Sequence, residues 1–118
     1  MTFTLPYPPT ANHAYTVARG RKIKTATARA YAHEVGWRVA EHMRGTSWRP
    51  TTTDRLQVTI GVHPPDSRRR DLANVEKLVV DAVCDQLNID DSQIDRLVLE
   101  RQPVNRQNPH LVLTLEAL

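Results

Sequence analysis

The sequence predicts an α+β fold in which two main helices pack against a mixed or antiparallel sheet. The first observation is that apolar and polar residues alternate in several short segments, which is typical of half-buried strands. The second is that apolar residues recur at spacings of three and four in two other segments, which is typical of helices with one buried face. The third is the order of these segments, because strands precede, separate and follow the two helices.

Length and composition define the broad class of protein. With 118 residues, 40% of them hydrophobic and 25% charged, the chain predicts a single domain over residues 1–118. No segment is apolar enough to span a membrane and no signal peptide is recognisable, so we expect a cytoplasmic protein without membrane partners or an organic cofactor. The single cysteine, Cys84, lies on an apolar helical stripe. A buried structural thiol is the favoured interpretation, and a reactive thiol is the alternative.

The N-terminal segment predicts a strand followed by a hairpin. Phe3 and Leu5 alternate with threonines, which indicates a short strand. Prolines at positions 6, 8 and 9 end it, because proline lacks the N–H that a sheet requires. Residues 15–24 then suit a hairpin with Gly20 at its tip.

The middle of the chain predicts a helix and the clearest strand. Apolar residues recur at helical spacing over residues 28–43, with Thr25 or Thr27 as candidate caps and Gly45 as the stop. Strict alternation from Leu56 to Val62 then indicates a half-buried strand.

The C-terminal half predicts a second helix and two further strands. The helix is expected to begin at or near Asp71 and to be followed by a tight loop over residues 88–91. Alternating residues around 97–99 and 111–115 indicate two strands, joined by the polar stretch 102–109. The apolar face of the helix consists of Leu72, Val75, Leu78, Val79 and Ala82.

Charged residues are distributed unevenly along a chain whose net charge is +3. Basic residues form one cluster around residues 19–24 and a second at residues 68–70, and acidic residues follow the second cluster directly. A basic surface beside carboxylates suits a metal-dependent nuclease, since cations hold phosphates and carboxylates hold a divalent cation.

Three aspartates are the candidate metal ligands, although each also has an ordinary structural interpretation. Asp71 at the start of the second helix and Asp90 and Asp91 after it can meet only if the chain folds back. Taken alone, Asp71 is a good helix N-cap, and Asp90 with Gln93 resembles a capping box. Both functions are compatible, because one carboxylate has several acceptor positions.

Other charged residues near these aspartates also have structural interpretations. Lys77 and Asp81 are four residues apart and suit an ordinary surface pair. The arginines of residues 68–70 could belong to a solvated loop. His63 has no metal-binding partner at a recognisable spacing, so a structural or DNA-contacting role is favoured over metal ligation.

Order and spacing distinguish these residues more than their types do. Arg68-Arg69-Arg70-Asp71-Leu72-x-Asn74-Val75-x-Lys77, Asp81-Ala82 and Asp90-Asp91-x-Gln93-Ile94 together resemble the signature of the RusA family of bacterial and prophage Holliday-junction resolvases. The N-terminal stretch Leu5-Pro6-Tyr7-Pro8-Pro9-Thr10-x-Asn12 and Pro103-Val104 resemble the same family, so the resemblance spans nearly the whole chain.

The resemblance implies a homodimer that nicks opposing strands of a four-way or branched DNA junction, in DNA recombination and repair. The expected cofactor is Mg²⁺, with Mn²⁺ as a substitute. Asp71 and Asp91 are the implied metal-binding and catalytic carboxylates, and Asp90 is an adjacent metal ligand. Lys77 is the implied catalytic lysine. The implied DNA-binding residues are Arg68, Arg69, Arg70, Lys22, Lys24 and Asn74.

Ala73 departs from the family pattern, which has a carboxylate at this position. Three explanations remain open: the protein manages with fewer ligands, the position carries a deliberate inactivating change, or the chain binds junctions without cutting them. The alternative function is therefore a non-catalytic branched-DNA-binding protein whose site is crippled at Ala73. A structural RNA-binding protein is the third hypothesis, but it leaves the paired aspartates unexplained.

Overall fold

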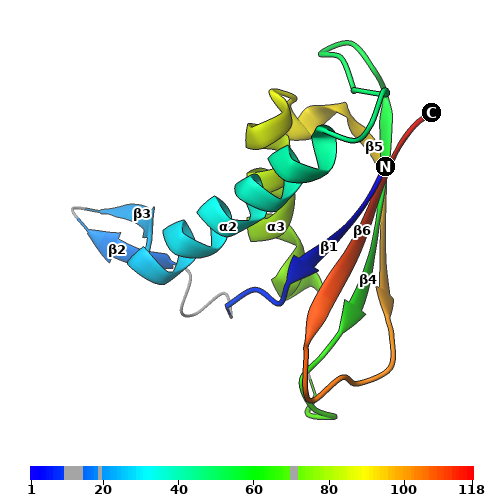
Figure 1. Ribbon diagram of the computed structural model, residues 1–118. Helices are drawn as coiled ribbons and strands as arrows, with labels where there is room; N and C mark the ends of the chain where they lie inside the picture. Colours follow the sequence, from blue (N-terminus) through cyan, green and yellow to red (C-terminus); the bar gives the residue numbers. More distant parts are fainter. Residues whose placement is uncertain (10–14, 19, 70–71) are drawn as a thin grey trace.

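The computed structural model describes residues 1–9, 15–18, 20–69 and 72–118, and for residues 15, 16, 18, 22 and 74 it describes the backbone alone. In this part of the chain, two long helices lie on one face of a four-stranded mixed sheet (Figure 1). The α+β prediction is confirmed. The elements are β1 (Thr2–Pro6), β2 (Tyr15–Ala18), β3 (Arg21–Lys24), α2 (Ala26–Met43), β4 (Leu56–His63), α3 (Ala73–Leu87), the 3₁₀ turn η1 (Asp91–Gln93), β5 (Ile94–Arg101) and β6 (His110–Ala117).

Strand β4 organises the sheet, whose order is β1-β6-β4-β5. It pairs antiparallel with β6 and parallel with β5, and β1 pairs antiparallel with β6. A tight turn cannot connect parallel neighbours, so the chain crosses from the end of β4 to the start of β5 through α3. The two ends of α3 therefore lie near opposite ends of the sheet (Figure 1).

The core lies between this sheet and the two helices. The predicted alternation in β4 is confirmed, because Leu56, Val58, Ile60 and Val62 are all at most 3% exposed. Strand β5 is an edge of the sheet, and its Leu97 remains 41% exposed. The buried helix residues are Ala28, Tyr31, Val35, Val39 and Met43 on α2 and Val75, Leu78, Val79, Ala82 and Val83 on α3.

The predicted hairpin and the predicted start of α2 are both confirmed. Strands β2 and β3 pair antiparallel, and Gly20 between them has a φ of +74°, which favours glycine. At the start of α2, the Oγ1 of Thr25 accepts a hydrogen bond from the N–H of Ala28 at 3.2 Å. Thr25 is thus the N-cap. The helix ends at Met43, two residues before the predicted stop at Gly45.

The start of α3 differs slightly from the prediction. The helix begins at Ala73, and Leu72 occupies the N-cap position without a side-chain capping bond. Asp71, the predicted cap, lies outside the described residues. At the other end, Asn88 takes a left-handed conformation with a φ of 55°, which ends the helix.

Gln93 is the one polar side chain classed as buried in the described part of the chain, at 5% exposed. Its Nε2 donates to the carbonyl oxygens of Thr51 at 2.8 Å and Asp54 at 3.0 Å. Its Oε1 accepts from the N–H of Asp90 at 2.9 Å. The side chain therefore joins the loop before β4 to the segment before β5, and its polar atoms are paired as burial requires.

Replacing Gln93 with alanine leaves two carbonyls and one N–H without this partner. We expect Gln93→Ala to lower the free energy of unfolding by about 3 kcal/mol, since each buried unpaired polar group costs on the order of 1–3 kcal/mol. Urea denaturation measures the change. The matched control is Gln107→Ala, an exposed site, expected to change stability by about 0.5 kcal/mol or less. Equal effects of the two substitutions would contradict the assigned role.

Candidate functional site

The predicted site residues fall into described and undescribed groups. Arg70 and Asp71 lie outside the described residues, as do the side chains of Lys22 and Asn74. Lys24 is half-buried at the end of β3. The remaining predicted residues are exposed to solvent: Arg68, Arg69, Lys77, Asp90 and Asp91.

Carboxylates gather where α3 ends and η1 begins. The buried thiol of Cys84 reports on them, because its pKa is raised to about 12, first by burial and then by negative charge. The charges that contribute are, in decreasing order, those of Asp91, Asp81, Asp85 and Asp90. These four aspartates therefore lie within electrostatic reach of one point on α3, and the buried structural interpretation of Cys84 is supported.

Asp90 and Asp91 differ in their hydrogen bonds. The side chain of Asp90 forms the predicted capping box with Gln93 and also accepts from the hydroxyl of Ser92. Asp91 begins η1, and its carboxylate makes no hydrogen bond or ion pair with the described residues. Of the two neighbouring carboxylates, Asp91 is therefore the one that no described residue engages through a hydrogen bond or ion pair.

Arg55 holds the same segment from the sheet side. Its guanidinium donates to the carbonyl oxygen of Ser92 at 3.0 Å and to both carboxylate oxygens of Asp95, one of them at 3.0 Å. The hydrogen bond from Arg55 lowers the pKa of Asp95. Together with Gln93, Arg55 fixes the backbone on both sides of Asp91 and thereby restricts where its carboxylate can lie.

Lys77 lies on an exposed face of α3. Its Nζ is 3.7 Å from a carboxylate oxygen of Asp81, so the predicted surface pair is confirmed. Ala73, Lys77 and Asp81 are spaced by four residues and share one side of the helix. A carboxylate at position 73 would therefore lie next to this lysine.

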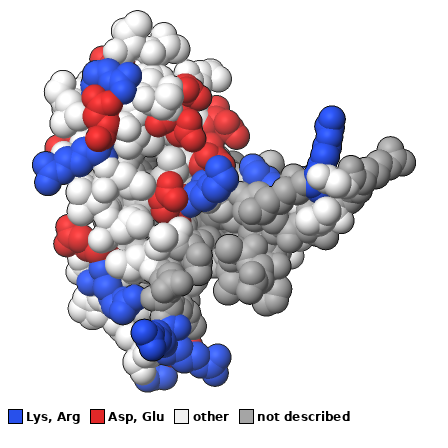
Figure 2. Space-filling model, turned by 180° about the vertical axis from the view of Figure 1, so that it is seen from behind, with Lys and Arg blue, Asp and Glu red and all other residues white. Residues whose placement is uncertain are grey.

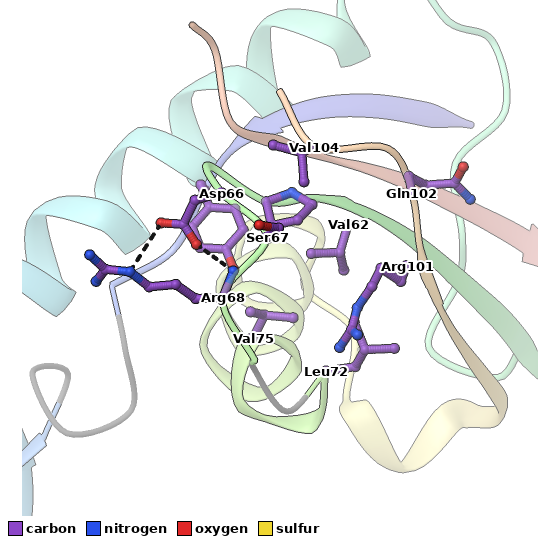
Figure 3. A pocket seen from close by; sticks show the side chains of 11 residues that line it. Val62, Asp66, Ser67, Arg68, Leu72, Val75, Arg101, Gln102 and Val104 are labelled. Carbon is purple, nitrogen blue, oxygen red and sulfur yellow. Dashed lines mark hydrogen bonds and ion pairs between the residues drawn. The ribbon is translucent and has the colours of Figure 1, made fainter. Parts of the chain in front are cut away.

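The loop between β4 and α3 carries the arginines. The carboxylate of Asp66 accepts from the backbone N–H of Arg68 at 2.9 Å and lies 3.9 Å from its Nε. Figure 3 shows this pair at the edge of a cavity that Leu72 and Val75 also line. The exposed guanidinium of Arg68 thus stands at the beginning of α3.

His63 has a structural role at the end of β4. Its Nδ1 is 3.0 Å from the carbonyl oxygen of Pro103, and its ring stacks on that of His110 with centroids 4.3 Å apart. The first contact connects β4 to the segment before β6, and the second connects it to the first residue of β6. They favour the structural interpretation that the sequence left open.

The two halves of the predicted site lie at opposite ends of α3. A helix of 15 residues is about 22 Å long. Arg68, Arg69 and Leu72 precede its first turn, whereas Asp90 and Asp91 follow its last turn. The described residues contain no group of three or more His, Cys, Asp or Glu side chains able to hold a metal ion. Within one chain, the structure therefore does not bring the arginine loop to the Asp90–Asp91 segment.

The surface repeats this division of charge. Figure 2 shows most of the visible acidic side chains in the upper part of one face, interspersed with lysine and arginine, and a group of lysine and arginine side chains at its lower end. A phosphate backbone would be attracted to the basic end, and a divalent cation to the acidic one.

Arg55, Arg101 and the existence of the cavity were not identified from the sequence, although several lining residues such as Arg68, Leu72 and Val75 were. Arg55 acts through Ser92 and Asp95, which are 37 and 40 residues away in the chain. Arg101 and Tyr7 line the cavity together with the loop after β4, although neither belongs to a charged cluster. No local pattern marks these residues, since their partners are adjacent only in space.

The environment of Cys84 predicts an unreactive thiol. Because burial and nearby carboxylates favour the neutral form, the thiolate fraction at about pH 8 should be very small. We expect a chromogenic disulfide reagent to modify the native protein far more slowly than the same protein unfolded in urea, measured by absorbance. Rapid stoichiometric modification of the native protein would contradict this placement of Cys84.

Known proteins resemble this chain over nearly its whole length. Residues 6–116 match the family described as endodeoxyribonuclease RusA. The chain is 33% identical over 104 residues to the crossover junction endodeoxyribonuclease of Enterobacteria phage 82, an alignment that covers 87% of this chain and 83% of that protein. It is 31% identical over 106 residues to the protein of the same name from Escherichia coli strain K12, covering 89% and 85%.

The match therefore covers the arginine loop, α3 and the Asp90–Asp91 segment together, as well as nearly every strand. No helix in the described ranges combines the length and apolar character needed to cross a membrane. The resemblance seen in the sequence motifs is confirmed, and this chain belongs to the RusA endodeoxyribonuclease family.

Proposed function

We propose that this chain is a Mg²⁺-dependent endonuclease that resolves four-way DNA junctions by paired nicks, in recombination and repair. The observation that carries the proposal is the match over residues 6–116 to proteins named crossover junction endodeoxyribonucleases. The carboxylate of Asp91 is exposed, and the backbone on either side of it is held by Gln93 and Arg55, which supports the assignment chemically. Such an oxygen donor suits a hard divalent cation.

Mg²⁺ fits the oxygen-rich donors of this chain, and Asp71 and Asp91 would hold it with Asp90 beside them. When bound, it would offset negative charge on the phosphate and favour ionisation of water. Lys77 contributes a mobile cation on the exposed face of α3, which can stabilise charge that develops on the phosphate oxygens. Gln93 and Arg55 position the Asp91 segment through its backbone.

We infer that the active unit is a homodimer with composite sites. The peptide bond from Asp71 leads directly to Leu72 at the start of α3, whereas Asp91 follows the end of that helix. Because the helix between Asp71 and Asp91 is about 22 Å long, the two carboxylates of one chain are too far apart to bind the same cation. A two-fold axis would place the start of α3 from one copy beside the end of α3 from the other, and it would do so twice. Two equivalent sites are what paired nicks require.

DNA contacts are assigned to basic residues at the start of α3 and on the hairpin. Arg68 and Arg69 are exposed before α3, and Arg70 continues the same run. The hairpin β2–β3, which carries Lys22 and Lys24, extends from the body beside the start of α2 (Figure 1). Asn74 joins this group at the start of α3. These residues would hold phosphates and orient the junction without reading its sequence.

A binding-only function remains the alternative because of Ala73. This residue is the first of α3 and is exposed, so the missing carboxylate is a chemical change at an accessible position. Such a protein would keep the arginines and bind branched DNA without cutting it.

Restoring the carboxylate separates the two functions. Ala73→Asp should fold normally, because a negative charge in the first turn of an exposed helix is favourable. If the natural site works with fewer ligands, junction cleavage should change by about tenfold or less; if Ala73 cripples the site, cleavage should rise by about a hundredfold or more. Gel assays with Mg²⁺ and with EDTA measure the nicks. The matched control, Ala26→Asp, places the same charge at the exposed first residue of α2.

Mixing inactive subunits tests the composite site. Asp71→Asn and Asp91→Asn should each abolish cleavage alone, yet mixed subunits should regain nicking, because each heterodimer contains one site with both aspartates intact. The control is the heterodimer of a double variant and wild type, separated from wild-type homodimers by a different affinity tag on each subunit, since every composite site in that heterodimer lacks one carboxylate. Labelled four-way junctions and a linear duplex report the products. Recovery only in the control mixture would show that each site lies within one chain.

A further inference from the structure

A cavity of about 180 Å³ lies at the carboxyl ends of the parallel strands β4 and β5, beside the start of α3 (Figure 3). This edge of a sheet, where neighbouring strands run to the same end and the next strand runs back, is a common place for ligands. The cavity is lined by Tyr7, Val62, Pro64, Asp66, Ser67, Arg68, Leu72, Val75, Arg101, Gln102 and Val104.

The inner wall of the cavity is apolar. Val62 is 2% exposed and Val75 is 8% exposed, and Leu72 lies beside them. Gln102 contributes mainly backbone, because its N–H donates to the carbonyl oxygen of Val62 at 2.9 Å and its side chain lies over Gly61. Figure 3 shows the Gln102 side chain directed away from the other lining residues. The wall therefore offers a dry surface to a flat ligand.

The rim is polar and mainly basic. Arg68 and Arg101 both line the cavity and are exposed, and Ser67 is an exposed lining residue on the same loop as Arg68. Asp66 is held in place by the backbone N–H of Arg68 at 2.9 Å. Figure 3 shows the Arg101 guanidinium beside Leu72, whereas the exposed Arg68 side chain extends outward from the adjoining loop. An apolar interior with one guanidinium beside it and a second on the adjoining loop suits a flat, hydrogen-bonding group attached to a phosphate.

We propose that this cavity receives one nucleobase that leaves the stack at the branch point of the junction, a proposal that rests on the proposed function. The lining residue Leu72 directly follows Asp71, so a base in the cavity would hold its own phosphate close to the start of α3. Stacking is interrupted at a branch point, so a base there leaves the helix at lower cost than in a duplex. Arg68 and Arg101 would hold the flanking phosphates or the polar edge of the base.

Blocking the mouth of the cavity tests this proposal. Val104 lines the cavity but is 40% exposed, so Val104→Trp adds bulk there without disturbing the core. Leu97→Trp is the matched control, because Leu97 is 41% exposed on β5 and does not line the cavity. With 2-aminopurine placed in turn at each branch-point position, and EDTA to prevent cleavage, wild type and Leu97→Trp should increase the fluorescence of one position. Val104→Trp should bind the junction but lose that signal and cut about tenfold more slowly.

Removing the base provides the second arm. An abasic nucleotide at the responsive position should slow wild-type cleavage by about tenfold, and Val104→Trp should cut this abasic junction about as fast as wild type cuts it, because both changes remove the same interaction. If Val104→Trp and the abasic nucleotide slow cleavage independently, so that the two fold-changes multiply, the proposal is wrong. Loss of the dimer in Val104→Trp, measured by sedimentation, would also overturn it and assign the cavity to the partner subunit.

Failure of this inference is distinguishable from failure of the proposed function. If wild-type protein nicks the four-way junction but no branch-point position gains fluorescence, the cavity proposal is wrong and the nuclease function stands. If wild-type protein neither binds nor cuts the junction while a linear duplex or RNA binds better, both are wrong.

Discussion

The crossover from β4 to β5 through α3 is the constraint on which the rest of the structure depends. Because these strands are parallel neighbours, the connecting helix must run back along the sheet, and its 15 residues span nearly the length of the strands. The arginine loop is thereby placed at one end of the domain and the Asp90–Asp91 segment at the other (Figure 1). A chain built in this way separates its arginine loop from these carboxylates, and the proposed homodimer would reunite them through a two-fold axis.

Buried polar groups then make the acidic end rigid. Gln93 satisfies two carbonyls and one N–H from a buried position, and Arg55 joins Ser92 to Asp95 near the start of β5. Neither residue carries the chemistry itself. Their contribution is to hold Asp91 on a short turn with its carboxylate exposed, which is the precondition for ligand binding at a defined position. Asp90 is engaged in the capping box, so the two adjacent aspartates have different roles despite identical side chains.

The basic end is organised around a cavity, so that it is more than a charged surface. Arginines on an exposed loop can hold a polyanion in many orientations, whereas an apolar wall built from Val62 and Val75 would admit only a group of suitable shape. Under the proposed function, the arginines would attract the DNA and the cavity would fix its position, and a structure-specific nuclease needs a fixed position in order to cut at a branch point.

The sequence by itself determined the fold class, the strand alternation, the Thr25 cap, the hairpin at Gly20, the Asp90–Gln93 capping box and the family, because each depends on residues close together in the chain or on a motif with fixed spacing. Only the tertiary structure decided that the chain does not fold back to bring the two ends of α3 together, and that Arg55 reaches Ser92 across 37 residues. It also decided that Tyr7, Val75 and Arg101 line one cavity. Strand order and direction determine these placements, and they arise from packing between distant segments that leaves no local periodicity in the sequence.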